Sequence, residues 1–163
     1  MKTIIHDLGK EQNDRLLAAA DRVVHADGRY APCQGCFNCW TKHPAACEMK
    51  DALHEICRVL GTSDEVTVIT KNLYGGYGAE IKNLLDRSIG ISTPLSTYRG
   101  GQMHHTLRYG KRERLQVIVY GDTSDAEKST WKLMAERNAV NMGFREHSVA
   151  FCANEEEAEE RAL

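Results

Sequence analysis

The sequence has no long hydrophobic run and no dominant sign of charge. Its longest apolar stretch spans only residues 16–20, far short of the roughly 20 residues that a membrane-spanning helix needs. The polar residues His6 and Asp7 follow the first few residues of the sequence, which lacks the apolar core of a secretory signal there. The net charge of −2 gives no electrostatic basis for nucleic-acid binding. We therefore expect a cytoplasmic protein that binds neither membranes nor nucleic acid.

Several enzyme motifs are also missing. The sequence has no Ser–His–Asp pattern, no HExxH pair and no Walker loop, so hydrolase and nucleotide-triphosphatase functions have no support. Its 163 residues, 42% of them hydrophobic, suit one domain of ordinary size with a packed core. We predict a single domain over residues 1–163.

Apolar, β-branched segments alternate with helical patterns along the chain. The segments predicted as strands are 3–6, 22–26, 65–70, 115–120 and 147–152. The segments predicted as helices are 10–20, 50–60, 79–89, 125–142 and a final acidic stretch from Asn154. The nearly continuous apolar character of 65–70 and 115–120 is typical of parallel strands buried on both faces. The alternation predicts an α/β fold with a doubly wound, five-stranded parallel sheet.

Residues 90–114 are long, polar and rich in glycine, histidine and arginine, and we predict a loop between a helix and the following strand. Loops of this length in a compact domain are usually functional or disordered. His104 and His105 diverge as neighbours in the chain, so hydrogen bonding to a bound ligand, a substrate or a partner subunit suits them better than joint metal chelation. Arg108 could pair with a phosphate or carboxylate. A hydrated surface loop or a dimer contact is the alternative.

Four of the six cysteines fall within fifteen residues, in a predicted loop over 31–49; they are Cys33, Cys36, Cys39 and Cys47. Such clustering outside a secreted chain indicates metal, cluster or redox chemistry. Three thiols at two-residue gaps and a fourth further on favour a [4Fe–4S] cluster over zinc, which usually takes two separated Cys-x2-Cys pairs. Zinc, metal-free thiols, a redox disulfide and small apolar filler remain alternatives. Cys57 and Cys152 are expected on core faces, where they would be inert.

A glycine-rich stretch, residues 70–78 (TKNLYGGYG), follows the third predicted strand and leads into a helix. In a doubly wound sheet, ligands bind beyond the carboxyl ends of the strands. Glycines there allow a flat or anionic ligand to approach the backbone, and the helix start offers free N–H groups. Tyr74 and Tyr77 could present faces to a conjugated ring. The alternative is a tight turn with two core aromatics.

The run from Ala31 to Arg87, APCQGCFNCW…C…D…ITKNLYGGYGAEIKNLLDR, resembles the flavodoxin-like NAD(P)H-dependent FMN reductases, most of all the branch with the iron–sulfur flavoproteins. The resemblance implies strand order 2-1-3-4-5, bound FMN and a homodimer. It also implies contacts with the flavin ring from the loop after the third strand, here Thr70, Asn72, Tyr74, Gly75, Gly76 and Tyr77. The helix that carries Lys82, Asp86 and Arg87 matches the family pattern as well.

The first loop departs from the family. Members usually hold the FMN phosphate with a Gly/Ser/Thr/Asn loop after the first strand, which implies Gly9, Lys10 and Asn13 here. This loop has no hydroxyl, and its acidic residues oppose a phosphate; they are Asp7, Glu11 and Asp14. One like-charge contact at about 4 Å costs on the order of a few kcal/mol at intermediate dielectric.

The resemblance therefore implies an FMN-dependent oxidoreductase that takes hydride from NAD(P)H and passes electrons to a small acceptor, a redox partner or a cysteine-held cluster. We assign no catalytic residue, because hydride transfer to a flavin needs no side-chain acid or base. The alternative is a thiol- or metal-binding or electron-transfer module on the same fold, without reductase activity. A flavin carrier is a third reading.

Overall fold

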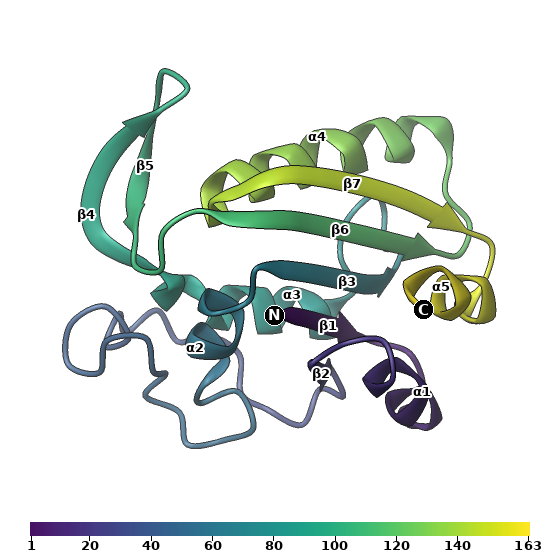
Figure 1. Ribbon diagram of the computed structural model, residues 1–163, viewed down its shortest axis with the longest axis horizontal. Helices are drawn as coiled ribbons and strands as arrows, with labels where there is room; N and C mark the ends of the chain where they lie inside the picture. The colour runs from purple at the N-terminus through teal and green to yellow at the C-terminus, as the bar shows by residue number, and fades with distance from the viewer.

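A parallel sheet of five strands forms the centre of the computed structural model, which describes residues 1–163 (Figure 1). The strands are β1 (Lys2–His6), β2 (Arg22–His25), β3 (Glu65–Lys71), β6 (Arg112–Tyr120) and β7 (Phe144–Cys152). They lie side by side in the order β2-β1-β3-β6-β7, all parallel. Counted without the two hairpin strands described below, this is the predicted order 2-1-3-4-5, and the doubly wound α/β fold is confirmed.

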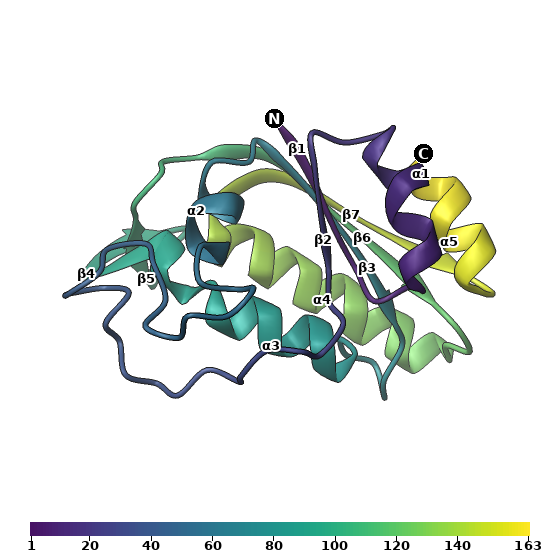
Figure 2. The same cartoon turned by 90° about the horizontal axis from the view of Figure 1, so that it is seen from below.

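Helices cover both faces of the sheet (Figures 1 and 2). On one face lie α1 (Asn13–Leu17) and α5 (Glu155–Ala162). On the other lie α2 (Ile56–Gly61), α3 (Ala79–Arg87) and α4 (Asp125–Met142). Two 3-10 turns, η1 (Lys10–Gln12) and η2 (Ile89–Ile91), precede α1 and follow α3.

The core is divided by the alternation of side chains along each strand. Ile4 and Ile118 pack in the cluster beneath α1 and α5, whereas Ile5 and Val117 pack in the larger cluster beneath α2, α3 and α4. Successive side chains of a strand point to opposite faces of a sheet. This explains why the strands are apolar along nearly their whole length, as a parallel sheet covered on both faces requires.

The prediction of a loop over 90–114 is wrong for most of its length. Two antiparallel strands, β4 (Ser92–Arg99) and β5 (Gln102–Leu107), form a hairpin that projects from the body (Figure 1). Gly100 and Gly101, both with positive φ, make its two-residue turn, which is a strong hairpin signal. The polar composition gave no strand pattern, because neither strand contributes a residue to the two buried hydrophobic clusters.

Some predicted boundaries also change. The helix predicted over 10–20 is only η1 and the short α1, and the helix predicted over 50–60 begins at Ile56 after a series of turns. The last strand begins three residues before the predicted 147. The predicted capping box of α4 is confirmed, because Ser124 and Glu127 cap each other reciprocally. None of the helices combines the length and hydrophobicity that crossing a bilayer requires.

Candidate functional site

The carboxyl ends of the central strands meet at one edge of the sheet, at the arrowheads in Figure 1. A pocket of about 260 Å³ opens there. Its lining residues come from β1, β3, β6 and the start of α3: Asp7, Lys71, Leu73, Gly78, Ala79, Glu80 and Tyr120. This is where a doubly wound sheet presents ligand sites, and it joins the two loops that the sequence singles out.

The glycine loop after β3 is held from within by one side chain. The Asn72 amide donates to the carbonyl of Asp122 at 2.8 Å, and its oxygen accepts the N–H of Gly75 at 3.1 Å and the indole N–H of Trp131 at 2.8 Å. These bonds tie β3 to β6 and to α4. The Asn72 side chain therefore positions the loop from within.

Tyr74 stands out at the tip of this loop. Its side chain is 94% exposed, and its backbone has φ +52°, in the left-handed region that non-glycine residues rarely adopt. Leu73 beside it is also exposed. An aromatic ring held in water by a strained backbone indicates a binding function more than a packing one. Among the aromatics expected at the site, Tyr74 has the geometry to stack on a flat ligand.

Tyr77 and Thr70 lie inside the protein. Tyr77 is buried, meets Trp131 edge-on with ring centroids 4.9 Å apart, and accepts a hydrogen bond from Asn138 at 3.0 Å. Burial raises the pKa of its hydroxyl. The fully buried Thr70 hydroxyl lies 3.1 Å from the Asp7 carboxylate and accepts the N–H of Gly78 at 3.0 Å. In this structure both side chains pack beneath the glycine loop. Tyr77 therefore matches the alternative prediction of a core aromatic.

Asp7 directly follows β1 and lines the pocket. One carboxylate oxygen accepts the N–H of Lys71 and the hydroxyl of Thr70, both at 3.1 Å. The other oxygen is buried without a partner. Burial, only partly offset by these hydrogen bonds, raises the Asp7 pKa above its usual value. Burial also raises the pKa of Tyr120, and the Asp7 charge adds to that shift.

The three residues that the family resemblance implies for the phosphate lie in and beside η1. Gly9 precedes η1 and packs against the Glu11 side chain. The Asn13 carboxamide oxygen lies 2.7 Å from the ring nitrogen Nε2 of His6 and is engaged there. Lys10 is exposed. Of the three residues that the family resemblance implies for phosphate, Lys10 alone has a free cationic group.

The donor set fits one half of FMN better than the other. Exposed Tyr74 and Leu73 and the adjacent glycine backbone fit the flat, largely apolar ring. At the pocket itself, Lys71 is the one cation, facing the carboxyl groups of Asp7 and Glu80. A phosphate dianion placed there meets two acidic side chains. The site thus favours binding of the flavin ring, whereas the Asp7 carboxylate disfavours binding of the phosphate.

All four cysteines of the predicted ligand set line one pocket of about 270 Å³. Cys33 and Cys36 are exposed, Cys47 is half-buried and Cys39 is buried. No three histidine, cysteine, aspartate or glutamate side chains converge closely enough to hold a metal ion. The prediction of one ligand set for a [4Fe–4S] cluster or zinc is therefore not supported by this structure, although the four cysteines line the same pocket.

Cys39 contacts a cysteine that lies outside the sequence cluster. The two side chains meet beside Gly90, and this proximity lowers the pKa of Cys39 to about 7 and raises that of Cys57. The Cys57 thiol donates to the carbonyl of Arg87 at 3.3 Å. Cys57 lies on a core face as predicted, with Cys39 beside it. The spacing of the cysteines alone gives no sign of this pair, because the two thiols meet only through tertiary packing.

An ion pair with a buried arginine anchors the cysteine-rich loop of residues 31–49, called the cysteine segment below. Arg87, which has a fully buried side chain, binds both carboxylate oxygens of Asp51 at 2.7 and 2.8 Å and donates to the carbonyl of Ala31 at 2.7 Å. The pair lowers the pKa of Asp51 to about 2. Arg87, which the family pattern includes, is thus a positioning residue that holds both ends of the segment against α3.

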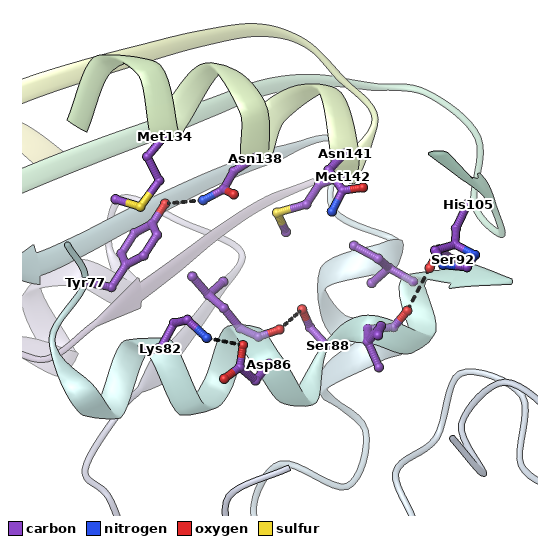
Figure 3. A pocket seen from close by; sticks show the side chains of 13 residues that line it. Tyr77, Lys82, Asp86, Ser88, Ser92, His105, Met134, Asn138, Asn141 and Met142 are labelled. Carbon is purple, nitrogen blue, oxygen red and sulfur yellow. Dashed lines mark hydrogen bonds and ion pairs between the residues drawn. The ribbon is translucent and has the colours of Figure 1, made fainter. Parts of the chain in front are cut away.

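A third pocket, of about 330 Å³, lies between α3 and α4 and is shown in Figure 3. His105 borders it at one end and Tyr77 at the other, with the Lys82–Asp86 ion pair along its wall. The His105 ring also packs on Trp40, with centroids 4.6 Å apart. Arg108 donates to the carbonyl of Gly90 at 3.1 Å. These hairpin residues hold the hairpin against the body, and Arg108 binds backbone instead of an anion.

The two chemical features of the sequence lie apart. The glycine loop is at the carboxyl ends of the strands, whereas the cysteine segment packs on the C-terminal end of α3 and on η2, near the base of the hairpin (Figures 1 and 2). The pockets at these two places share no lining residue. Within one chain, the cysteines therefore do not border the pocket that would take a flavin.

The sequence matches no protein-family model and no curated protein. Its fold, however, is similar to solved structures across nearly the whole chain. A FMN-dependent NADH-azoreductase from Bacillus anthracis, solved with FMN, is 12% identical with a TM-score of 0.58, over 99% of this chain and 93% of that one. An NAD(P)H:quinone oxidoreductase from Methanothermobacter marburgensis is 14% identical with a TM-score of 0.56, over 99% and 93%.

A flavodoxin, WrbA-like protein from Agrobacterium tumefaciens is 12% identical with a TM-score of 0.51, over 99% of this chain and 88% of that one. At such identities the likeness establishes the fold. The chain has the flavodoxin-like fold of these proteins, in agreement with the family resemblance of residues 30–87.

Proposed function

We propose that this protein is a FMN-dependent oxidoreductase of the NAD(P)H-dependent FMN reductase family, which takes hydride from NAD(P)H and reduces a small diffusible acceptor. The observation that carries the proposal is the exposed Tyr74, held on an internally braced glycine loop beside a pocket at the carboxyl ends of the strands. A similar structure solved with bound FMN, the azoreductase described above, supports it. The flavin, when bound, supplies the hydride and electron chemistry.

The residues of the chain supply position and shielding. Tyr74 and Leu73 would pack on the ring and exclude water from one face, and the backbone at Gly75 and Gly76 would allow close approach. Lys71 would face the anionic end of the ligand. Asn72 contributes by positioning, because its three hydrogen bonds fix the loop that carries these residues.

A diffusible acceptor suits the structure better than a cysteine-held centre of the same chain. The cysteine segment does not border the glycine loop, and its thiols do not converge on a metal site. Solvent, in contrast, reaches Tyr74 directly. A quinone or free flavin could approach from that side. The homodimer and the cytoplasmic location stay predictions.

Titration of FMN and riboflavin into the protein, followed by quenching of flavin fluorescence, tests the binding site. Tyr74→Ala should weaken both ligands about tenfold, the scale of one lost aromatic stacking contact. Tyr98→Ala is the matched control, because Tyr98 is 76% exposed but lies on the projecting hairpin. Equal effects of the two variants would refute the site. NADH oxidation with a quinone, absent without added flavin, tests the reaction.

The second candidate function is a thiol module without reductase activity. The contact between Cys39 and Cys57 favours it, independently of any flavin. A protein that quenches neither flavin but consumes oxidant through its thiols would establish this reading instead.

A further inference from the structure

The strongest unassigned feature is a pair of thiols that meet beneath the cysteine pocket. Cys39 lies in the turns after β2, and Cys57 lies in the first turn of α2. Both face Gly90: a Cβ built on that glycine would lie 2.8 Å from the Cys57 sulfur and 3.1 Å from the Cys39 Cβ. Only a residue without a side chain leaves this space open, so the two cysteines pack into one small volume.

The two thiols differ in access. Cys39 lines the pocket of about 270 Å³ that opens to solvent, whereas Cys57 is fully buried and does not line it. A small reagent that enters the pocket therefore meets Cys39 first. Cys57 lies behind the pocket lining, in the core. This is the arrangement of an attacking thiol with a resolving thiol behind it.

The backbone around Cys39 is fixed, so the pair does not depend on a chance approach. The Cys39 carbonyl accepts the N–H of Ala45 at 3.0 Å, and the indole N–H of Trp40 donates to the carbonyl of Ile89 at 3.1 Å. The Cys57 thiol is held by the carbonyl of Arg87 at 3.3 Å. Turns of the cysteine segment, α2 and the end of α3 thus converge on the pair.

We propose that Cys39 and Cys57 form a redox-active pair that a hydroperoxide oxidises to a disulfide. The Cys39 sulfur attacks the peroxide, forming an S–O bond and breaking the O–O bond, and releases water or an alcohol. The Cys57 sulfur then displaces the hydroxyl of the Cys39 sulfenic acid as water, forming the S–S bond. Two thiols lose two electrons and two protons, and the peroxide takes up both.

This pair is distinct from the sequence motif. The Cys33-x2-Cys36 pair is the obvious dithiol by spacing, but both of these residues are exposed, whereas Cys39 and Cys57 are buried. Cys47 lines the same pocket and lies nearer the Arg87 end. The proposal does not rest on flavin binding, so its outcome and that of the proposed function are independent.

Peptide mapping of the full-length protein tests the pair. The reduced protein, with six free cysteines, is treated with equimolar hydrogen peroxide, alkylated, digested and analysed by mass spectrometry. We expect a Cys39–Cys57 disulfide and loss of two of the six thiols. A Cys33–Cys36 disulfide as the main product, or a protein that keeps all six thiols, would overturn the proposal.

Variants separate attack from resolution. Cys57→Ala should leave a sulfenic acid on Cys39 that dimedone labels, whereas Cys39→Ser should abolish thiol loss at Cys57. Cys36→Ser and Cys152→Ser are controls, since the first lines the pocket and the second lies in the other core cluster; both should retain the disulfide. If Cys57→Ala does not fold, the wild-type map still decides. Loss of the Cys39–Cys57 peptide in Cys36→Ser would refute the pairing.

Discussion

Replacing Asp7 by asparagine should strengthen FMN binding. The Asp7 carboxyl lines the pocket at the carboxyl ends of the strands, and its partnerless oxygen is buried there. An asparagine oxygen can still accept from the Lys71 N–H and the Thr70 hydroxyl, so the end of β1 keeps its geometry. The substitution removes the negative charge and places an amide NH2 group where the partnerless oxygen lies.

The magnitude follows from Coulomb's law. A carboxylate about 5 Å from a phosphate charge at an effective dielectric near 20 costs about 3 kcal/mol. Salt screening reduces this, and we expect about 1–2 kcal/mol, or about 5–30-fold tighter FMN binding at neutral pH. Riboflavin lacks the phosphate, and its affinity should change less than twofold.

The assay is fluorescence quenching by both flavins, from pH 5 to 8. Because the Asp7 pKa is raised, acidification should neutralise this carboxyl and strengthen FMN binding in the wild type. The pH dependence should be smaller in Asp7→Asn. Asp14→Asn is the control, since Asp14 belongs to the same acidic stretch but is exposed and does not line the pocket. If Asp7→Asn leaves FMN affinity unchanged, or improves riboflavin equally, the pocket does not hold the phosphate.

Three further predictions concern stability and the loop. Arg87→Met should lower the free energy of unfolding by about 3–5 kcal/mol in urea titrations, because it leaves Asp51 without its buried partner. A loss below 1 kcal/mol would contradict this. In the wild type, the Asp51 pKa is lowered to about 2, so the ionised carboxylate stabilises the fold fully above the unfolded pKa near 4. As the pH falls towards 2, this stabilisation of about 2 kcal/mol should be lost, and Arg87→Met should not show that loss. Tyr74→Gly should raise the melting temperature, because glycine adopts φ +52° without strain, yet weaken flavin binding; a lower melting temperature would argue against strain at this residue.

The sheet was predictable because each of its strands carries its own signal. Residues 65–70 and 115–120 are apolar and β-branched, and Ser124 with Glu127 marks a helix start by local chemistry alone. The hairpin of β4 and β5 was not predicted, because its strands bury little apolar surface and show no alternation of apolar and polar residues. Its Gly100-Gly101 turn was the available clue.

The site was predictable at the level of segments but not of side chains. The sequence identifies the glycine loop, yet Tyr74 and Tyr77 are two aromatics three residues apart, and only packing decides that one is 94% exposed and the other buried. Similarly, the cysteine spacing draws attention to Cys33 and Cys36. The contact of Cys39 with Cys57 depends on how α2 meets the end of α3, which no local pattern encodes.

The bracing of the glycine loop by Asn72 also bears on the thermodynamics of ligand binding. A loop whose bonds to Asp122, Gly75 and Trp131 already exist has little conformational freedom left to lose when a ligand arrives. Association should then carry a small entropic penalty from the protein, and the on-rate should be that of a preformed surface without a slow ordering phase. Asn72→Ala would convert the same residues into a loop that must order at each encounter.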